Sequence, residues 1–147
     1  MSNPKAPSFA TTLRVRDTCL CLHLQRAARA VARHFDEAFR AFGLTNGQFS
    51  LLMALNRPEP PAIGRVAALL AMDRTTLTAA LKPLARRGLV EITVDPADRR
   101  GRRLVLTPSG RAALAAALPV WQAEHAAIGR RLAADGEPLR AELRSLC

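Results

Sequence analysis

Hydrophobic residues recur every three or four positions along two long stretches of this chain, one near each end. The first stretch runs unbroken over residues 13–42, and the second follows Thr107-Pro108, which supplies an N-cap and a first-turn proline. This spacing places apolar side chains on one face of a helix, so each stretch is predicted to be a long amphipathic helix. The first stripe consists of Leu20, Leu24, Ala27, Val31, Phe35, Ala38 and Phe42, and the second of Leu114, Leu118, Trp121, His125, Ile128 and Leu132.

The first long helix is expected to end at Gly43, and two shorter helices, the second and third of the chain, are expected after it. Thr45 and Gln48 stand three residues apart ahead of an apolar run and form a capping-box pair, which marks a helix start. The proline-rich segment 57–61 forbids helix and ends this element. A third, short helix is then expected over residues 64–70.

A fourth helix is predicted over residues 74–87. Asp73 is a good N-cap, and Gly88 is placed to end the helix in a left-handed conformation. Pro83 removes one backbone hydrogen bond inside this stretch, so the helix is expected either to bend or to shorten there.

The period then changes from that of a helix to that of a strand. Residues 89–94 and 102–106 are rich in β-branched and aliphatic side chains and are joined by an Asp-Pro turn, which predicts a β-hairpin. Its tip, residues 98–103, carries four arginines. Asp135-Gly136 ends the last long helix, and a short amphipathic helix is expected to close the chain.

This order of elements predicts a mainly α (α+β) fold class, a winged helix-turn-helix with a long helix at each end. In that fold the last short helix enters a DNA major groove. Two long helices with apolar stripes are poorly buried by so small a domain, which favours a C2 homodimer. The predicted organisation is a mobile N-terminal arm over residues 1–12, a dimerisation helix over 13–42, a DNA-binding domain over 43–106 and C-terminal dimerisation helices over 107–147.

Composition adds a strong basic bias. The 147 residues include 22 Lys and Arg against 12 Asp and Glu, a formal net charge of +10, and only Lys5 and Lys82 are lysines. Such a charge suggests a polyanionic partner, either nucleic acid or an anionic membrane. Half of it falls on residues 74–103, whereas residues 43–73 are neutral. Because the charge is gathered over the fourth helix and the hairpin, it favours double-stranded DNA.

Several classes of protein are excluded by simple patterns. No uncharged apolar stretch approaches the roughly 18–20 residues of a membrane span, and residues 1–12 lack the apolar core of a secretory signal. The three cysteines are odd in number and show no CxxC zinc pattern. We therefore expect a protein of the reducing cytoplasm, with no membrane partner, metal or cofactor.

The candidate DNA contacts lie on the fourth helix and on the hairpin. Side chains on the first turns of a recognition helix reach base edges, where Arg pairs with guanine and Thr donates, accepts or touches a thymine methyl. Basic residues further along such a helix are better placed for phosphates, and hairpin arginines for a neighbouring minor groove. The expected contacts are Arg74, Thr75, Thr76 and Thr78 at the helix start, Lys82 and Arg86 further along, and Asp98, Arg99, Arg100 and Arg102 on the hairpin.

Three segments carry a resemblance to a known family. Asp-Arg-Thr-Thr-Leu-Thr from Asp73, Leu-Ala-Arg-Arg-Gly-Leu-Val from Leu84 and the hairpin run from Asp95 to Gly110 resemble the MarR family of bacterial transcriptional regulators. The similarity covers residues 13–133. It implies a homodimer on a pseudo-palindromic operator, an Asp-x-Arg motif at Asp98 and Arg100 whose carboxylate orients an arginine, and a small aromatic ligand held near the dimer helices.

The sequence departs from the family pattern on the fourth helix. Ala79 stands where many members carry arginine, and Pro83 lies in the same helix. The resemblance therefore does not define which bases are read.

Two cysteines lie close together on the first long helix. On a continuous helix Cys19 and Cys21 point to nearly opposite faces and do not bridge easily. By its distance from Gly43, Cys21 is similar to the peroxide-sensing cysteine of the OhrR-like branch, although this chain lacks the tyrosines that such sensors use. Cys21 is thus the redox candidate, and packing in an apolar helix is the alternative.

Basic residues of the same helix are candidates for a ligand. His23 and Arg26, together with Arg29 and Arg33, are placed to receive the carboxylate of a small aromatic acid, although such residues often form only a solvated face. No histidine has a partner at metal-ligand spacing. His125 is expected to be a packed or interface histidine.

Three functions compete on this evidence. The favoured one is a sequence-specific DNA-binding regulator, a dimeric repressor released by a small aromatic or phenolic ligand, with a peroxide-sensing repressor using Cys21 as the variant. The second is a non-specific architectural DNA-binding protein, suggested by charge alone. An enzyme is not expected, because no base and orienting acid accompany Cys21 at a nucleophile-bearing turn.

Overall fold

The computed structural model describes residues 6–147, which form two compact units that meet between His34 and Phe35. Part of the predicted mobile arm, residues 1–5, lies outside the described residues. No helix in the described part is long and apolar enough to cross a membrane.

The first unit contains a helix break where an unbroken helix was predicted. Helix α1 (Phe9–Thr18) begins inside the predicted arm, because Ser8 caps it by accepting a hydrogen bond from the Thr11 amide (3.2 Å). The chain leaves helical geometry at Cys19 (φ −68°, ψ 108°) before α2 (Leu20–Phe39) begins. The Thr18 hydroxyl donates to the Arg14 carbonyl (2.7 Å), and back-bonding of this kind weakens and bends helices.

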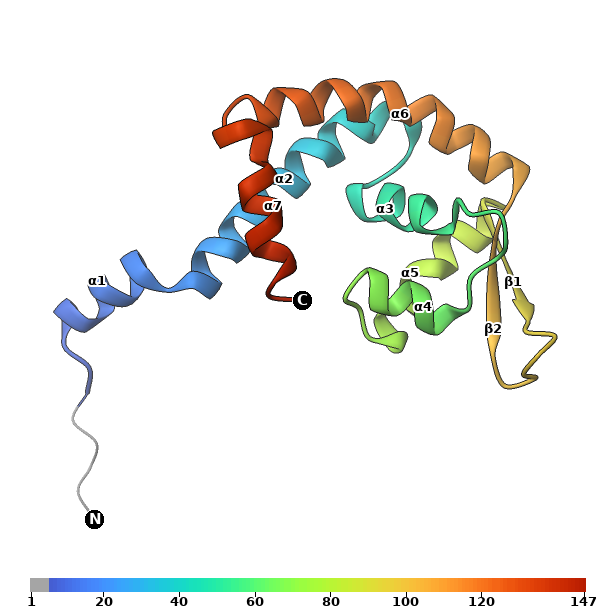
Figure 1. The fold of residues 1–147 in the computed structure, drawn as a ribbon, viewed down its shortest axis with the longest axis horizontal. Coiled ribbons are helices and arrows are strands. Elements are labelled where there is room, and N and C mark those ends of the chain that lie inside the picture. The colour runs from blue at the N-terminus through green and yellow to red at the C-terminus, as the bar shows by residue number, and fades with distance from the viewer. Residues whose placement is uncertain (1–5) are drawn as a thin grey trace, which may run out of the picture. The chain divides into compact units, whose positions relative to one another are not determined.

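The second unit holds the predicted helix-turn-helix. After α2 a 3₁₀ turn (Arg40–Phe42) ends at Gly43, whose φ of +65° is left-handed. Helices α3 (Asn46–Leu55), α4 (Ile63–Leu69) and α5 (Arg74–Arg86) follow, close to their predicted positions (Figure 1).

The predicted helix caps are confirmed. Thr45 and Gln48 form both bonds of a capping box, and Asp73 accepts from the Thr76 amide at the start of α5. Helix α5 continues past Pro83 as far as Arg86, so it does not shorten at the proline. Gly88 then has a φ of +69°, the left-handed conformation that glycine adopts without strain.

The wing is an antiparallel hairpin of β1 (Val90–Val94) and β2 (Arg102–Leu106). Its register pairs Val90 with Leu106 and Ile92 with Leu104. The chain ahead of α4 joins the outer edge of β2, because Ala62 bridges to Arg103 and the Leu104 amide donates to the Pro61 carbonyl (3.0 Å). The wing is therefore tied to the start of α4.

Two helices complete the second unit. Helix α6 (Pro108–Gly129) runs alongside α3 (Figure 1). A 3₁₀ segment (Ala133–Gly136) with left-handed Ala134 and Asp135 breaks it from α7 (Glu137–Arg144). Apolar side chains from the end of α2, from α3, α4 and α5, from the wing and from α6 form one core. Its most deeply buried large side chains are Phe39, Leu52, Leu55, Leu77, Leu81, Leu84, Leu104 and Val66.

Candidate nucleic-acid interface

Helix α5 divides its residues cleanly between the core and solvent. Leu77, Leu81 and Leu84 are buried, and this anchors the helix with its opposite face outward. All six polar and basic residues predicted to contact DNA from this helix are exposed: Arg74, Thr75, Thr76, Thr78, Lys82 and Arg86.

Asp73 orders the first turn of α5. Its carboxylate accepts the Thr76 amide (2.7 Å) and the Thr76 hydroxyl (2.9 Å), and these bonds lower the pKa of Asp73. Because the Thr76 hydroxyl already donates to Asp73, its oxygen is left as an acceptor for a base or a phosphate-bound water.

Arg74 lies across the start of α4. A Cβ atom added to Gly64 would come within 2.8 Å of the Arg74 Nη2 atom, so the guanidinium occupies the space that this glycine leaves open. The first basic residue of the recognition helix is thus placed between the two helices of the helix-turn-helix.

Arg87, just beyond α5, has a structural contact. Its Nη1 donates to the Gly43 carbonyl (2.8 Å), across 44 residues of sequence. This bond ties the end of the recognition helix to the end of the 3₁₀ turn. The sequence pattern did not predict this bond.

The wing tip is ordered by backbone bonds. The Asp98 carboxylate accepts the Arg100 amide (3.0 Å), so in this structure it shapes the turn that carries Arg100. Arg102 Nη1 donates to the carbonyls of Arg99 (3.3 Å) and Gly101 (3.0 Å). The side chains of Arg99, Arg100 and Arg102 are all exposed, as expected.

The base of the wing contains an ion pair that sequence reasoning missed. Asp95, only 7% exposed, accepts the Ala97 amide (3.0 Å) and lies 3.0 Å from Arg103 Nε. Two contacts lower the pKa of Asp95: the hydrogen bond from the Ala97 amide has the larger effect, and the Arg103 guanidinium has the smaller one. Arg103 also donates to the Pro60 carbonyl (3.1 Å), so one arginine links the wing to the loop ahead of α4.

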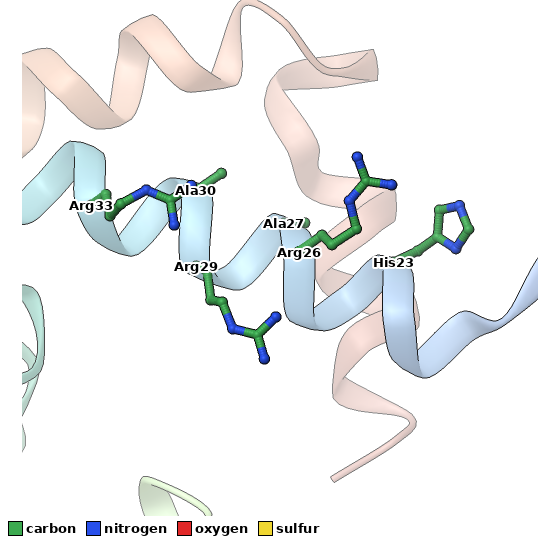
Figure 2. Close-up of a pocket in the computed structure, with 6 residues that line it drawn as sticks. All are labelled: His23, Arg26, Ala27, Arg29, Ala30 and Arg33. Carbon is green, nitrogen blue, oxygen red and sulfur yellow. The ribbon is translucent and has the colours of Figure 1, made fainter. Parts of the chain in front are cut away.

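The ligand candidates of the first unit lie along one face of α2 (Figure 2). His23, Arg26, Arg29 and Arg33 border a shallow hollow of about 550 Å³ whose apolar lining is limited to two alanines. Arg29 donates to the Gln25 side chain (3.2 Å). The arginines of this face could bind an anion, but the face has no large apolar side chain against which an aromatic ring could pack.

A second hollow, in the second unit, was not visible in the sequence. It measures about 380 Å³ and lies among α3, α4 and α6. Phe49 and Trp121 stack along it at a ring distance of 6.3 Å, and Trp121 stacks on His125 at 4.7 Å, so His125 is a packed histidine as expected. The lining consists of Phe49, Ser50, Met53, Ala54, Arg57, Leu69, Leu70 and Trp121.

The cysteines lie outside both hollows. In the single chain Cys21 is exposed and Cys19 is half-buried. Among residues 6–147 no three His, Cys, Asp or Glu side chains gather into a group that could hold a metal ion.

The three-helix unit, its exposed polar recognition helix and the adjoining basic hairpin define a winged helix-turn-helix protein. The MarR family model matches residues 42–101, which include α3, α4, α5, β1 and the wing tip.

Individual relatives agree with this match. The chain is 34% identical over 95 residues to the transcriptional activatory protein BadR of Rhodopseudomonas palustris; the match covers 63% of this chain and only about half (54%) of BadR. The crystal structure of the Mycobacterium tuberculosis transcriptional regulator MosR in complex with DNA superposes with a TM-score of 0.80 at 36% identity, over 87% of this chain and 92% of MosR. Bordetella bronchiseptica BpsR, whose DNA binding is regulated by 6-hydroxynicotinic acid, gives a TM-score of 0.76 at 27% identity, over 86% of this chain and 91% of BpsR.

The chain therefore belongs to the MarR family of transcriptional regulators. It is a regulator and not an enzyme, in agreement with the prediction from sequence.

Proposed function

We propose that two copies of this chain bind a pseudo-palindromic DNA operator and repress transcription from it. In each copy α5 enters the major groove, with Arg74, Thr75 and Thr78 at base edges. The wing arginines Arg99 and Arg100 reach the flanking minor groove. MosR, similar over most of its length, has been crystallised with DNA, which supports this assignment.

The observation that carries the proposal is the position of the charge. Residues 74–103 hold half of the net charge of +10, and all their basic side chains except that of Arg103 are exposed, on or next to two adjoining elements, α5 and the wing. Residues 43–73, which precede them, have no net charge. Within the second unit, a basic surface concentrated on a recognition helix and a wing matches the footprint of a DNA-binding domain better than an even spread of charge would.

The dimer is supported by apolar side chains that the single chain leaves in solvent. In the second unit Leu132, Leu139 and Leu146 are 40%, 42% and 59% exposed, and α7 has no buried residue. In the first unit Leu20 and Val31 are 60% and 41% exposed along α2. A second copy related by a two-fold axis is the commonest way to cover such surfaces.

Binding to DNA upstream of the protein's own gene tests the proposal. Fluorescence anisotropy at 150 mM salt is expected to show a discrete site bound at least about a thousand times more tightly than random DNA. Light scattering should give twice the chain mass. Equal affinity for random DNA would overturn the proposal in favour of the architectural protein.

We further propose that the hollow among α3, α4 and α6 binds a small aromatic acid that releases the DNA. Its volume and apolar, aromatic lining suit a single substituted ring. Arg57, held by its Nε bond to the Ala54 carbonyl (3.0 Å), stands at the wall where a carboxylate would bind. Helix α4 lines this hollow and packs on α5, so a bound ring that moved α4 would disturb the recognition helix. The effect of 6-hydroxynicotinic acid on BpsR supports this class of ligand.

Trp121, the only tryptophan, reports on this hollow. Titration with benzoate, salicylate and 6-hydroxynicotinate is expected to quench its fluorescence for at least one acid. Arg57→Ala should weaken that acid by about tenfold or more, the usual cost of losing a charged hydrogen-bond partner. The matched control is Arg26→Ala on α2. Loss of binding in Arg26→Ala alone would instead assign the ligand to the surface bordered by His23 and Arg26.

A further inference from the structure

We propose that Gly64 of α4 is a positioning residue for DNA recognition, a role that rests on the proposed function. Gly64 has no side chain with which to contact DNA. Its effect comes through Arg74, the first residue of the recognition helix, whose guanidinium lies against it. The missing Cβ of Gly64 determines where that guanidinium lies, whether its target on the DNA is a base edge or a phosphate.

The guanidinium of Arg74 faces Gly64 with three of its atoms. From the point where a Cβ atom of residue 64 would stand, Arg74 Nη2 lies at 2.8 Å, Cζ at 3.6 Å and Nε at 3.8 Å. Gly64 is the second residue of α4, and Arg74 is the first of α5. The arginine side chain therefore reaches from the start of the recognition helix to the start of the preceding helix, and only a residue without a Cβ leaves room for it there.

Packing, rather than an ion pair, gives Arg74 this position. Both oxygens of the adjacent Asp73 carboxylate are engaged by Thr76, whose amide donates to Oδ1 (2.7 Å) and whose hydroxyl donates to Oδ2 (2.9 Å). Among residues 6–147 Arg74 forms no ion pair with a carboxylate. Since a guanidinium carries five N–H donors and these are not tied to a counter-ion, they are available to DNA.

Contact with Gly64 lowers the entropic cost of binding DNA through Arg74. Arg74 is exposed, and a long exposed side chain loses rotamer freedom when a ligand fixes it. A guanidinium that already lies against a neighbouring helix has lost part of that freedom before the DNA arrives. We therefore expect Gly64→Ala, which displaces the guanidinium, to weaken DNA binding by about twofold to tenfold, the ordinary cost of ordering one such side chain.

The same substitution leaves the fold intact. Apart from α4 itself, the three atoms nearest to an added Cβ all belong to the flexible tip of Arg74. Gly64 is not among the glycines with a left-handed backbone, so alanine fits its conformation, and alanine favours a helix more than glycine does. Gly64→Ala should therefore unfold at the same urea concentration as the wild type or at a higher one. A loss of DNA affinity in this variant is then separable from a loss of stability.

A double-mutant cycle tests the positioning role. Fluorescence anisotropy gives the affinity of the wild type, Gly64→Ala, Arg74→Ala and the double variant for an operator and for a random duplex at low salt. We expect Gly64→Ala to weaken binding in the presence of Arg74 and to have no effect when residue 74 is alanine. Gly47→Ala is the matched control, because Gly47 is also the second residue of its helix, α3, and the nearest atom to its added Cβ is 4.0 Å away. This control should bind DNA as the wild type does.

The contact itself is measured without DNA. The Nε–Hε cross-peak of Arg74 is identified in an NMR spectrum by its absence from Arg74→Lys. We expect Gly64→Ala to shift this cross-peak and Gly47→Ala to leave it in place. An unshifted cross-peak in Gly64→Ala would overturn the contact.

Two results of the cycle would overturn the positioning role. One is an equal loss of affinity from Gly64→Ala with and without Arg74, and the other is binding by Gly64→Ala that is as tight as that of the wild type or tighter. The second result would mean that Arg74 leaves Gly64 when DNA binds. Absence of any preferred operator would count against the proposed function alone, because the cross-peak and the cycle on random DNA do not depend on an operator.

Discussion

Arg103 Nε lies 3.0 Å from Asp95 Oδ2, and this ion pair closes the base of the wing. Asp95 also accepts a hydrogen bond from the Ala97 amide, which stabilises the turn of the hairpin. Arg103 also donates to the Pro60 carbonyl in the loop ahead of α4. Gly101 packs closely against this pair: a Cβ at this position would lie 3.2 Å from the Asp95 Cβ, so a larger residue would require its neighbours to shift by a few tenths of an ångström. The wing that carries the arginine tip is thus positioned by a small polar cluster rather than by its strands alone.

This cluster makes wing order dependent on pH. Its bonds lower the pKa of Asp95, so its contribution is complete above the pKa of an unfolded Asp and is lost as the pH falls through the lower, folded value. We expect the protection of the Ala97 and Gly101 amides, measured by NMR relative to exchange in an unstructured peptide at the same pH, to decrease in acid. In Asp95→Asn this protection should already be lost at pH 7, and operator affinity should be about tenfold lower. The control is Glu91→Gln on exposed β1, and an unchanged acid profile in Asp95→Asn would refute the role of this carboxylate.

Arg100 at the wing tip is expected to contribute sequence-independent affinity. Arg100→Ala should weaken binding by a similar factor on all operator variants and reduce the slope of log K against log salt by about one. The Asp98 bond to the residue 100 amide remains in this variant, so the turn keeps its shape. A salt titration by anisotropy measures the slope, and a slope equal to that of the wild type would place Arg100 away from the DNA.

Arg74 at the start of α5 is expected to act differently. Arg74→Ala should relax the preference for one base pair in each half-site, at about 1–3 kcal/mol, because bidentate guanine contacts have that value. Competition among single-base operator variants measures it. If Arg74→Ala loses the same affinity for every operator variant, Arg74 contacts the phosphate backbone, and the threonines at the start of α5 recognise the bases.

The features of this fold that could be predicted from the sequence are those that depend on contacts between residues close together in the chain. Caps at Thr45, Asp73 and Thr107 each join residues three apart, so their signals are local and they occur where expected. The break at Cys19 was missed because no glycine or proline marks it, and the Thr18 hydroxyl bond that accompanies it leaves no trace in the apolar pattern.

The unpredicted parts of the candidate sites join distant segments. The hollow depends on Phe49 and Trp121, which lie 72 positions apart and meet only because α3 packs on α6. The Arg87 bond to Gly43 is of the same kind. Residue type marked the arginines that we propose to face DNA, but it could not separate them from Arg87 and Arg103, whose partners are set by tertiary structure.

Thr107 is expected to stabilise the junction between wing and α6. Its hydroxyl donates to the Gly88 carbonyl (2.6 Å) and its oxygen accepts the Gly110 amide (3.0 Å). Thr107→Ala loses the cap and leaves the Gly88 carbonyl without this donor, at a cost of about 1–2 kcal/mol. Urea unfolding measures it, with the neighbouring exposed Ser109→Ala as control. Equal midpoints for the two variants would contradict the role of the cap.

Gly110 sets how closely α6 approaches the wing. A Cβ at this position would lie 2.1 Å from the Leu89 carbonyl oxygen and 2.7 Å from a Leu106 methyl, and the carbonyl belongs to backbone that cannot turn aside. We expect Gly110→Ala to destabilise the fold by about 3 kcal/mol, at the upper end of overpacking effects. Gly47→Ala in α3, where the nearest atom is 4.0 Å away, is the matched control and should gain up to about 1 kcal/mol of helix propensity. Thermal or urea unfolding separates the two, and similar stability of both variants would show that α6 can move away from the wing without loss.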